Sequence, residues 1–197
     1  MSGKHSGFPA GTESDDDLVV RVGRGEKSAF ETLYRRWARR VMAYAYRSLS
    51  DRGEAEDVVQ ETFLSLYRAA PNYKPRERFG AFLFRIAGNA VRSRVRRKIP
   101  LPLDFSEEED GSPSIEAPRD WLLFEERERI ARALATLPEG SRDALLLAVI
   151  GGLSYREIAE ESGISEDAVA ARISRSRKAL RKALSPEGSE KEEKVDA

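Results

Sequence analysis

The sequence predicts an all-α protein in which two small helical domains are joined by an acidic, flexible linker. Apolar residues recur with the period of an α-helix on both sides of residues 99–119, and no useful length of chain alternates as a strand does. Residues 99–119 hold four prolines and a run of acids, a composition typical of a linker. Charged residues make up 35% of the 197 residues, which favours amphipathic helices with one face in water.

The same observations set the domain boundaries. The first domain is expected at 15–98 and the second at 120–184, with the linker at 99–119 between them. Residues 1–14 and 185–197 are polar and lack a period, so we expect both tails to be disordered.

The first domain is predicted to contain four helices. Asp15 and the two acids after it suit the start of a helix, whose dipole favours negative charge there. Ser28 and Glu31 form an S-x-x-E pattern, which predicts a capping box at the start of the second helix. The third helix is expected over about 54–70 and the fourth over about 79–98, with a proline-containing loop between them.

Apolar spacing also predicts the buried faces of these helices. The second helix would bury Phe30, Leu33, Tyr34, Trp37, Val41 and Tyr44. The fourth helix would bury Phe79, Phe82, Leu83, Ile86 and Ala90.

The clearest local pattern of the second domain predicts a helix-turn-helix. Two helices are expected over about 154–161 and 166–183, and Gly163 supplies the sharp turn between them. Ser165 can cap the second of these helices, whose outward face is basic. Such a helix fits the DNA major groove, with early residues on bases and later basic residues on phosphates. The candidate DNA-binding residues here are Ser165, Arg172, Arg175, Arg177 and Lys178.

The early part of this helix is poor in hydrogen-bonding side chains. Ala168, Ala170 and Ala171 offer only methyl groups, so we expect affinity to depend on phosphate contacts and to fall with salt. The alternative is a helical hairpin with a solvated basic face. The inward Ile158 and Ala159, together with the turn and the cap, favour DNA binding.

A row of polar and basic side chains follows one face of the predicted fourth helix. Its members are Arg78, Arg85, Asn89, Arg92 and Arg96. Their spacing places them in one narrow sector of a helix. Few acids lie four residues away to pair with them, which favours phosphate binding over a solvated face. Asn89 could hydrogen-bond a base, and Tyr73 in the preceding loop could stack on one, although an ordinary loop aromatic is equally compatible.

An acidic ridge is expected on the third helix. Glu56, Asp57, Gln60 and Glu61 lie off its apolar face. Alone they would form an ordinary surface, but they lie between two basic regions that suit DNA. We therefore interpret the ridge as a protein-binding surface.

Composition excludes several kinds of site. The chain has no cysteine, so disulfides, thiolate metal sites and a cysteine nucleophile are ruled out. Its one histidine, His5, lies in the predicted tail, and no phosphate-binding glycine loop, catalytic triad or metal-ligand cluster is visible. We expect no enzyme activity, cofactor, metal or small-molecule substrate. No apolar run or export signal is found, so we expect a cytoplasmic protein without membrane insertion.

Three segments in this order resemble the extracytoplasmic-function (ECF) group of bacterial sigma factors. Residues 53–64 are similar to the core-polymerase-binding segment of sigma region 2, and residues 79–89 to the promoter-melting helix that follows it. Residues 134–177 resemble sigma region 4. The resemblance covers about residues 15–184 and implies a protein that binds core RNA polymerase and directs it to promoter DNA.

The resemblance implies roles for the predicted surfaces. Docking on the coiled coil of the polymerase beta-prime subunit would use Asp57, Gln60, Glu61 and Phe63. Region 4 would contact the beta flap and the minus-thirty-five element. An anti-sigma factor is a further expected partner.

It also implies how the first domain would open DNA. Tyr73, Arg78 and Asn89 would capture a flipped base of the minus-ten element, since unstacking can be offset by contacts in a pocket. Arg85, Arg92 and Arg96 would hold the strand backbone.

Two other functions remain open from the sequence. A polymerase-independent helix-turn-helix regulator would bind duplex DNA as a dimer on half-sites. A sigma-like decoy would bind polymerase, or a regulator of sigma factors, without opening promoters. The alanines at the base-reading positions keep this last alternative open.

Overall fold

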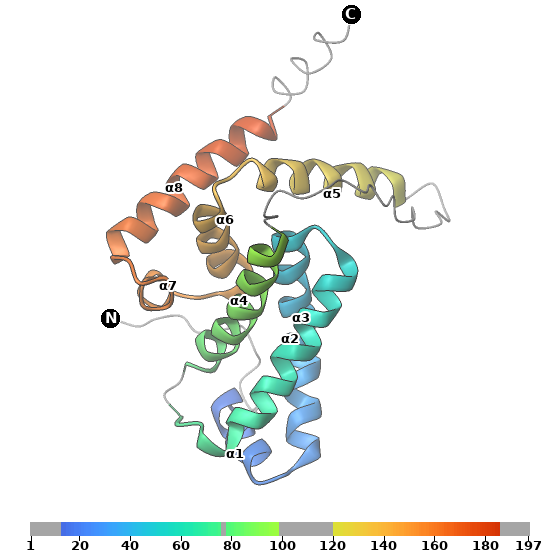
Figure 1. The fold of residues 1–197 in the computed structure, drawn as a ribbon, viewed down its shortest axis with the longest axis vertical. Coiled ribbons are helices and arrows are strands. Elements are labelled where there is room, and N and C mark those ends of the chain that lie inside the picture. The colour runs from blue at the N-terminus through green and yellow to red at the C-terminus, as the bar shows by residue number, and fades with distance from the viewer. Residues whose placement is uncertain (1–12, 76–77, 99–119, 186–197) are drawn as a thin grey trace, which may run out of the picture.

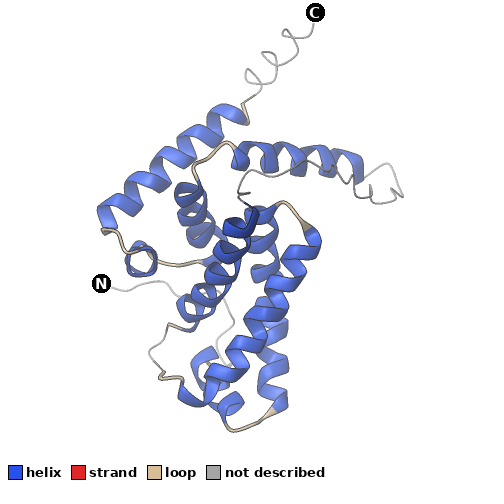
Figure 2. Cartoon of the chain, viewed as in Figure 1, coloured by secondary structure: helices blue, strands red, loops and turns tan. Residues whose placement is uncertain are grey.

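The described part of the chain is helical in both halves, as the sequence predicts. A computed structural model describes residues 13–75, 78–98 and 120–185, and no strand occurs among them (Figures 1 and 2). The first domain contains α1 (Asp15–Gly23), α2 (Lys27–Leu49), α3 (Arg52–Ala69), a 3₁₀ turn η1 (Ala70–Asn72) and α4 (Phe79–Lys98). The second contains α5 (Asp120–Ala135), α6 (Glu139–Leu146), a π turn η2 (Leu147–Gly151), α7 (Tyr155–Ser162) and α8 (Glu166–Ala183). The predicted linker and most of both tails lie outside the described residues.

Helices α2, α3 and α4 form the bundle of the first domain. Leu33, Trp37, Val41 and Tyr44 of α2 are buried, as their spacing predicts. Tyr34 is an exception, because its side chain remains 44% exposed beside α3. The prediction for this residue was wrong because it lies at the edge of the apolar stripe.

Helix α4 is buried on more of its surface than the sequence predicts. Phe79, Leu83 and Ala90 are buried as expected, but Phe82 and Ile86 are only partly buried. Phe84 was not predicted and is fully buried. Its ring meets Tyr44 edge-on at 5.5 Å, and a Cβ added at Gly151 of the second domain would lie 3.4 Å from it.

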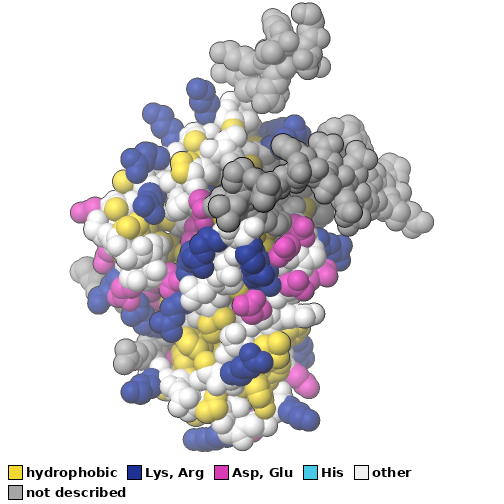
Figure 3. Space-filling view, viewed as in Figure 1, with side chains coloured by type: hydrophobic (Ala, Val, Ile, Leu, Met, Phe, Trp, Pro, Cys, Tyr) yellow, Lys and Arg dark blue, Asp and Glu magenta, His cyan; other side chains and the backbone are white. Residues whose placement is uncertain are grey.

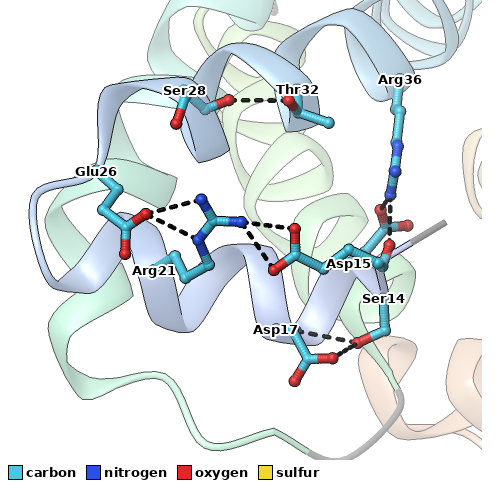
Figure 4. A network of polar contacts seen from close by, with 9 residues as sticks. Ser14, Asp15, Asp17, Arg21, Glu26, Ser28, Thr32 and Arg36 are labelled. Carbon is cyan, nitrogen blue, oxygen red and sulfur yellow. Dashed lines mark hydrogen bonds and ion pairs between the residues drawn. The ribbon is translucent and has the colours of Figure 1, made fainter.

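The capping box predicted at Ser28 is wrong. Helix α2 starts at Lys27 with Glu26 as its N-cap, so Ser28 lies inside the first turn, where its carbonyl accepts a bond from the Thr32 hydroxyl (Figure 4). The pattern S-x-x-E does form a capping box at Ser154 and Glu157, before α7.

Helix α1 is fixed to the bundle by polar contacts at both ends. Ser14 accepts a bond from the backbone N–H of Asp17, and Arg21 is paired with Glu26 at 2.8 Å (Figure 4). The Asp15 carboxylate accepts bonds from the Trp37 indole at 3.0 Å and from a neighbouring arginine of α2. Glu13, whose carboxylate contacts Arg21 at 2.6 Å, and the N-cap residue Ser14 were assigned to the tail from sequence but belong to the folded domain.

The two domains are docked on one another, an arrangement that the sequence left open. Arg40 of α2 donates to the carbonyl oxygens of Ile150 at 3.0 Å and Gly151 at 2.9 Å, at the end of η2. The Tyr44 hydroxyl donates to Asp143 of α6 at 2.5 Å. Buried residues of both domains form one continuous apolar cluster.

The packing of α1 on η1 can be tested with a matched pair of glycine substitutions. A Cβ at Gly23 would lie 2.7 Å from the carbonyl oxygen of Ala70, whereas the nearest such atom to Gly53 is 3.6 Å away. We expect Gly23→Ala to lower the free energy of unfolding by roughly 1–3 kcal/mol, the cost of overpacking. Gly53→Ala should raise it by about 0.5–1 kcal/mol, because alanine favours a helix. Urea unfolding followed by circular dichroism measures both, and equal effects would contradict this packing.

Candidate nucleic-acid interface and partner surface

The predicted row on α4 is present, but its members differ in environment. Arg85, Asn89 and Arg96 are exposed. The Arg85 guanidinium stacks over the Phe82 ring at 5.5 Å, which orients it along the helix surface. No acid pairs with Arg85 or Arg96 among the described residues, so both are available for phosphate.

The other two arginines of the row are paired with the second domain. Arg78 contacts Glu160 at 2.7 Å and Glu157 at 3.4 Å. The hydrogen bond with Glu160 raises the pKa of Arg78 and, in turn, lowers the pKa of Glu160. Both groups are therefore charged at neutral pH.

Arg92 is the more buried of the two. It contacts Glu161 at 2.7 Å and Asp143 at 3.4 Å, and it donates to the Asn89 side-chain oxygen at 2.7 Å. Burial alone would lower the pKa of Arg92, but the bond to Glu161 and the charge of Asp143 raise it above its usual value.

Tyr73 is held by contacts on both its ring and its hydroxyl. The ring packs against Phe82 at 4.9 Å between centroids, and the hydroxyl donates to Asp16 of α1 at 2.6 Å. Burial and this bond raise the pKa of Tyr73. Asp16 was missed in the sequence because its partner is 57 residues away. As placed, Tyr73 fixes the loop before α4 to α1.

The acidic ridge on α3 lies beside an exposed apolar surface. Asp57 and Gln60 are exposed, while Glu61 contacts the buried Arg94 of α4 at 2.8 Å. Leu64 follows Asp57 on the same face of α3 and is 54% exposed.

Phe63 lies beneath this surface. It is buried under Tyr34, with the ring centroids 4.7 Å apart. Tyr67, 51% exposed, follows Leu64 by about one helical turn, and its ring packs edge-on against Phe30 at 5.8 Å between centroids. These side chains and Tyr34 form an apolar patch. Hydrophobic side chains gather over the lower part of Figure 3, where α3 runs. The sequence pattern assigned Tyr34 to the core and so did not reveal the patch.

The helix-turn-helix is formed by α7 and α8 as predicted. Gly163 ends α7 with φ +66°, and the Ser165 side chain accepts a bond from the Ala168 N–H at the start of α8. Val169 and Ile173 are buried, so the opposite face of α8 points outward.

The outward face of α8 is basic from Arg175 onward, whereas its first turn carries the acids Glu166 and Asp167. Arg175, Arg177 and Lys178 are exposed, and basic side chains stand along α8 at the upper left of Figure 3. Arg172 instead lies partly buried against α6, where a Cβ at Gly140 would come within 2.9 Å of its guanidinium.

Other kinds of site have no support in the described residues. No group of three or more His, Cys, Asp or Glu in this part of the chain could hold a metal ion. None of the described helices is long and apolar enough to cross a membrane.

Comparison with known proteins matches both domains. Residues 33–99 match the family model of Sigma-70 region 2, and residues 127–180 match that of Sigma-70, region 4. The RNA polymerase sigma-H factor of Pseudomonas aeruginosa is 35% identical over 184 residues, which cover 88% of this chain and 95% of that protein. The ECF RNA polymerase sigma-E factor of Escherichia coli is 33% identical over 183 residues, with the same coverage. A solved structure of CnrH in complex with the cytosolic domain of CnrY superposes with a TM-score of 0.68 at 29% identity, over 87% of this chain and 97% of that one.

The pairing of Glu61 with Arg94 separates the stability effects of two ridge acids. Glu61→Gln should lower the free energy of unfolding by about 0.5–1 kcal/mol, the value for a half-exposed ion pair. Asp57→Asn should leave it unchanged, because no ion pair of Asp57 is found among the described residues. Urea unfolding of the two variants is the measurement, and a ranking in the opposite order would contradict the assignment.

Proposed function

Because the chain belongs to the ECF group of the sigma-70 family, we propose that its exposed surfaces divide polymerase docking and promoter recognition between the two domains. The matches to both sigma regions and to the ECF relatives confirm the family that the three sequence motifs predict. The protein is a sigma factor that directs RNA polymerase to promoters for transcription initiation. Members of this family are transcription initiation factors and not enzymes. The observation that carries the assignment is the occurrence of region 2 and region 4 in order on one chain.

In this proposal core polymerase docks on the ridge and apolar patch of α3. Asp57, Gln60 and Glu61 supply polar and acidic contacts, and the neighbouring Leu64 and Tyr67 supply apolar area. An apolar patch rimmed by polar residues is typical of a protein-binding surface. The partner element would be the coiled coil of the beta-prime subunit, with Phe63 supporting the patch from below.

The row on α4 would contact the minus-ten element. Exposed Arg85 and Arg96 would hold the strand backbone, and Asn89 would hydrogen-bond an unstacked base. Arg78 and Arg92 would join them once released from the second domain. Tyr73 would act by fixing the loop beside this site, since its hydroxyl is bound to Asp16.

The second domain would bind the upstream promoter element and the beta flap. The basic face of α8 suits the phosphates that flank the minus-thirty-five major groove. Ser165, at the start of that helix, would lie next to the DNA. Val149 and Tyr155 are 64% and 38% exposed, and they would offer apolar contacts to the flap. Because the three alanines early in α8 offer no hydrogen bonds to bases, the DNA affinity of this domain would come mainly from phosphate contacts.

An anti-sigma factor is proposed as a regulatory partner. The similar structure of CnrH contains the cytosolic domain of CnrY, and the exposed apolar patch of the present chain suits such a partner. A cytoplasmic location follows from a function on RNA polymerase and chromosomal DNA.

Run-off transcription with core polymerase and a promoter library tests the proposal. We expect promoter-specific transcripts with the wild-type protein. Asn89→Ala and Arg85→Ala should each reduce them by roughly tenfold or more, as expected for loss of a base or backbone contact, while core binding is retained. Asp57→Ala with Gln60→Ala should instead weaken core binding.

Arg97→Ala is the matched control, because it removes the same charge from α4 outside the row. Core binding without any stimulated transcript would overturn the initiation function and leave a decoy. Duplex binding without any core binding would leave a polymerase-independent regulator.

A further inference from the structure

The docked domains bring four carboxylates of the second domain onto Arg92 of α4 and onto Arg78, the residue before this helix. Three of the acids, Glu157, Glu160 and Glu161, are three and four residues apart and share one face of α7. The fourth, Asp143, comes from α6. We call these four residues the acidic face.

The acidic face occupies the hydrogen-bonding groups that a phosphate would use. Arg78 and Arg92 each contact two of its carboxylates, with shortest distances of 2.7 Å. Guanidinium binds carboxylate and phosphate with the same fork of N–H donors. A DNA strand and the acidic face therefore cannot use these donors at the same time.

The contacts of Arg92 are partly shielded from solvent, whereas the Arg78–Glu160 pair is more open, with side chains 39% and 49% exposed. The side chains of Glu161, Glu157 and Asp143 are 10%, 19% and 19% exposed, and that of Arg92 is 28% exposed. Ion pairs that are partly buried are screened less by salt than surface pairs. Arg92 also engages Asn89, so the same contact restrains the residue proposed to meet a base.

Independent contacts hold the acidic face in register with α4. Arg40 binds two carbonyl oxygens at the end of η2, where the helix dipole is negative, and the Tyr44 hydroxyl binds Asp143. Phe84 is fully buried between Trp37 and Tyr44 of α2 and Gly151 of η2. The ion pairs thus lie at the rim of a packed contact, and Figure 1 shows α7 beside the start of α4.

We propose that the acidic face is an intramolecular binding surface for Arg78 and Arg92, which competes with the promoter strand and keeps the free protein closed. This inference rests on the proposed role of α4 in DNA binding. Arg85 and Arg96 stay exposed in the closed form, so a strand can engage them first and then displace the carboxylates from Arg78 and Arg92.

Domain closure can be measured by fluorescence energy transfer. The chain has no cysteine, so Arg47→Cys and Glu139→Cys give a single labelled pair. Both positions are exposed and lie in different domains, and Glu139 lines the same pocket as Ser48, the neighbour of Arg47, so the labels are close together in the closed form. The test variant is Glu160→Gln with Glu161→Gln. Glu157 is kept, because its carboxylate also caps α7. The control is Glu31→Gln with Glu128→Gln, two exposed acids for which no ion pair is found in the described part of the chain.

We expect high transfer in the wild type and the control at low salt. Transfer should fall between about 50 mM and about 500 mM salt, over which screening of the ion pairs increases severalfold. The test variant should show lower transfer already at 50 mM and a weaker response to salt. Equal transfer and salt response in the test and control variants would overturn the proposal.

Affinity for a short single-stranded oligonucleotide, measured by fluorescence anisotropy at fixed low salt without polymerase, tests the competition. The test variant should bind at least roughly fivefold more tightly than the control, the lower end of typical coupling between sites. Unchanged affinity would overturn the competition even if the domains open. Failure of the proposed initiation function would be seen separately, as absence of stimulated transcript from the wild-type protein.

Discussion

The burial of α4 on two sides is the constraint on which the rest of the structure depends. One side packs in the first domain through Phe79 and Leu83, and the other meets the second domain through Phe84. Arg85, Asn89 and Arg96 remain in water along one sector of the helix, and Arg97 is exposed near its end. A small helical domain buries a limited apolar area. Because α4 uses a second apolar face for the contact between domains, the position of that face determines where the second domain docks. The ion pairs at the rim follow from that position.

Much of the fold could be predicted from local periodicity. The bounds of α4 and of the helix-turn-helix follow from apolar spacing and turn residues, because these are short-range properties. The burial of Phe84 could not be predicted, since it depends on contacts with α2 and with a domain that begins more than thirty residues later. The capping box was assigned to Ser28 and missed at Ser154, because the S-x-x-E pattern alone does not tell where a helix begins.

The candidate surfaces show the same division between local and distant effects. The row on α4 and the ridge on α3 follow from helical geometry. That Glu61 pairs with Arg94, that Tyr73 binds Asp16, and that Arg78 and Arg92 meet acids of the second domain all depend on contacts between distant parts of the chain. Sequence spacing within one helix could therefore identify these side chains but not their partners, nor which arginines are free.

The Glu157 carboxylate serves two domains at once. One of its oxygens accepts bonds from the backbone N–H and hydroxyl of Ser154, both at 2.8 Å, and the other faces Arg78 at 3.4 Å. A substitution there would alter the start of α7 and the contact between domains together. Selection on the strength of domain closure is therefore expected to act through Glu160 and Glu161, which can change without loss of that cap. Related chains could differ in how readily they open while their helix-turn-helix stays intact.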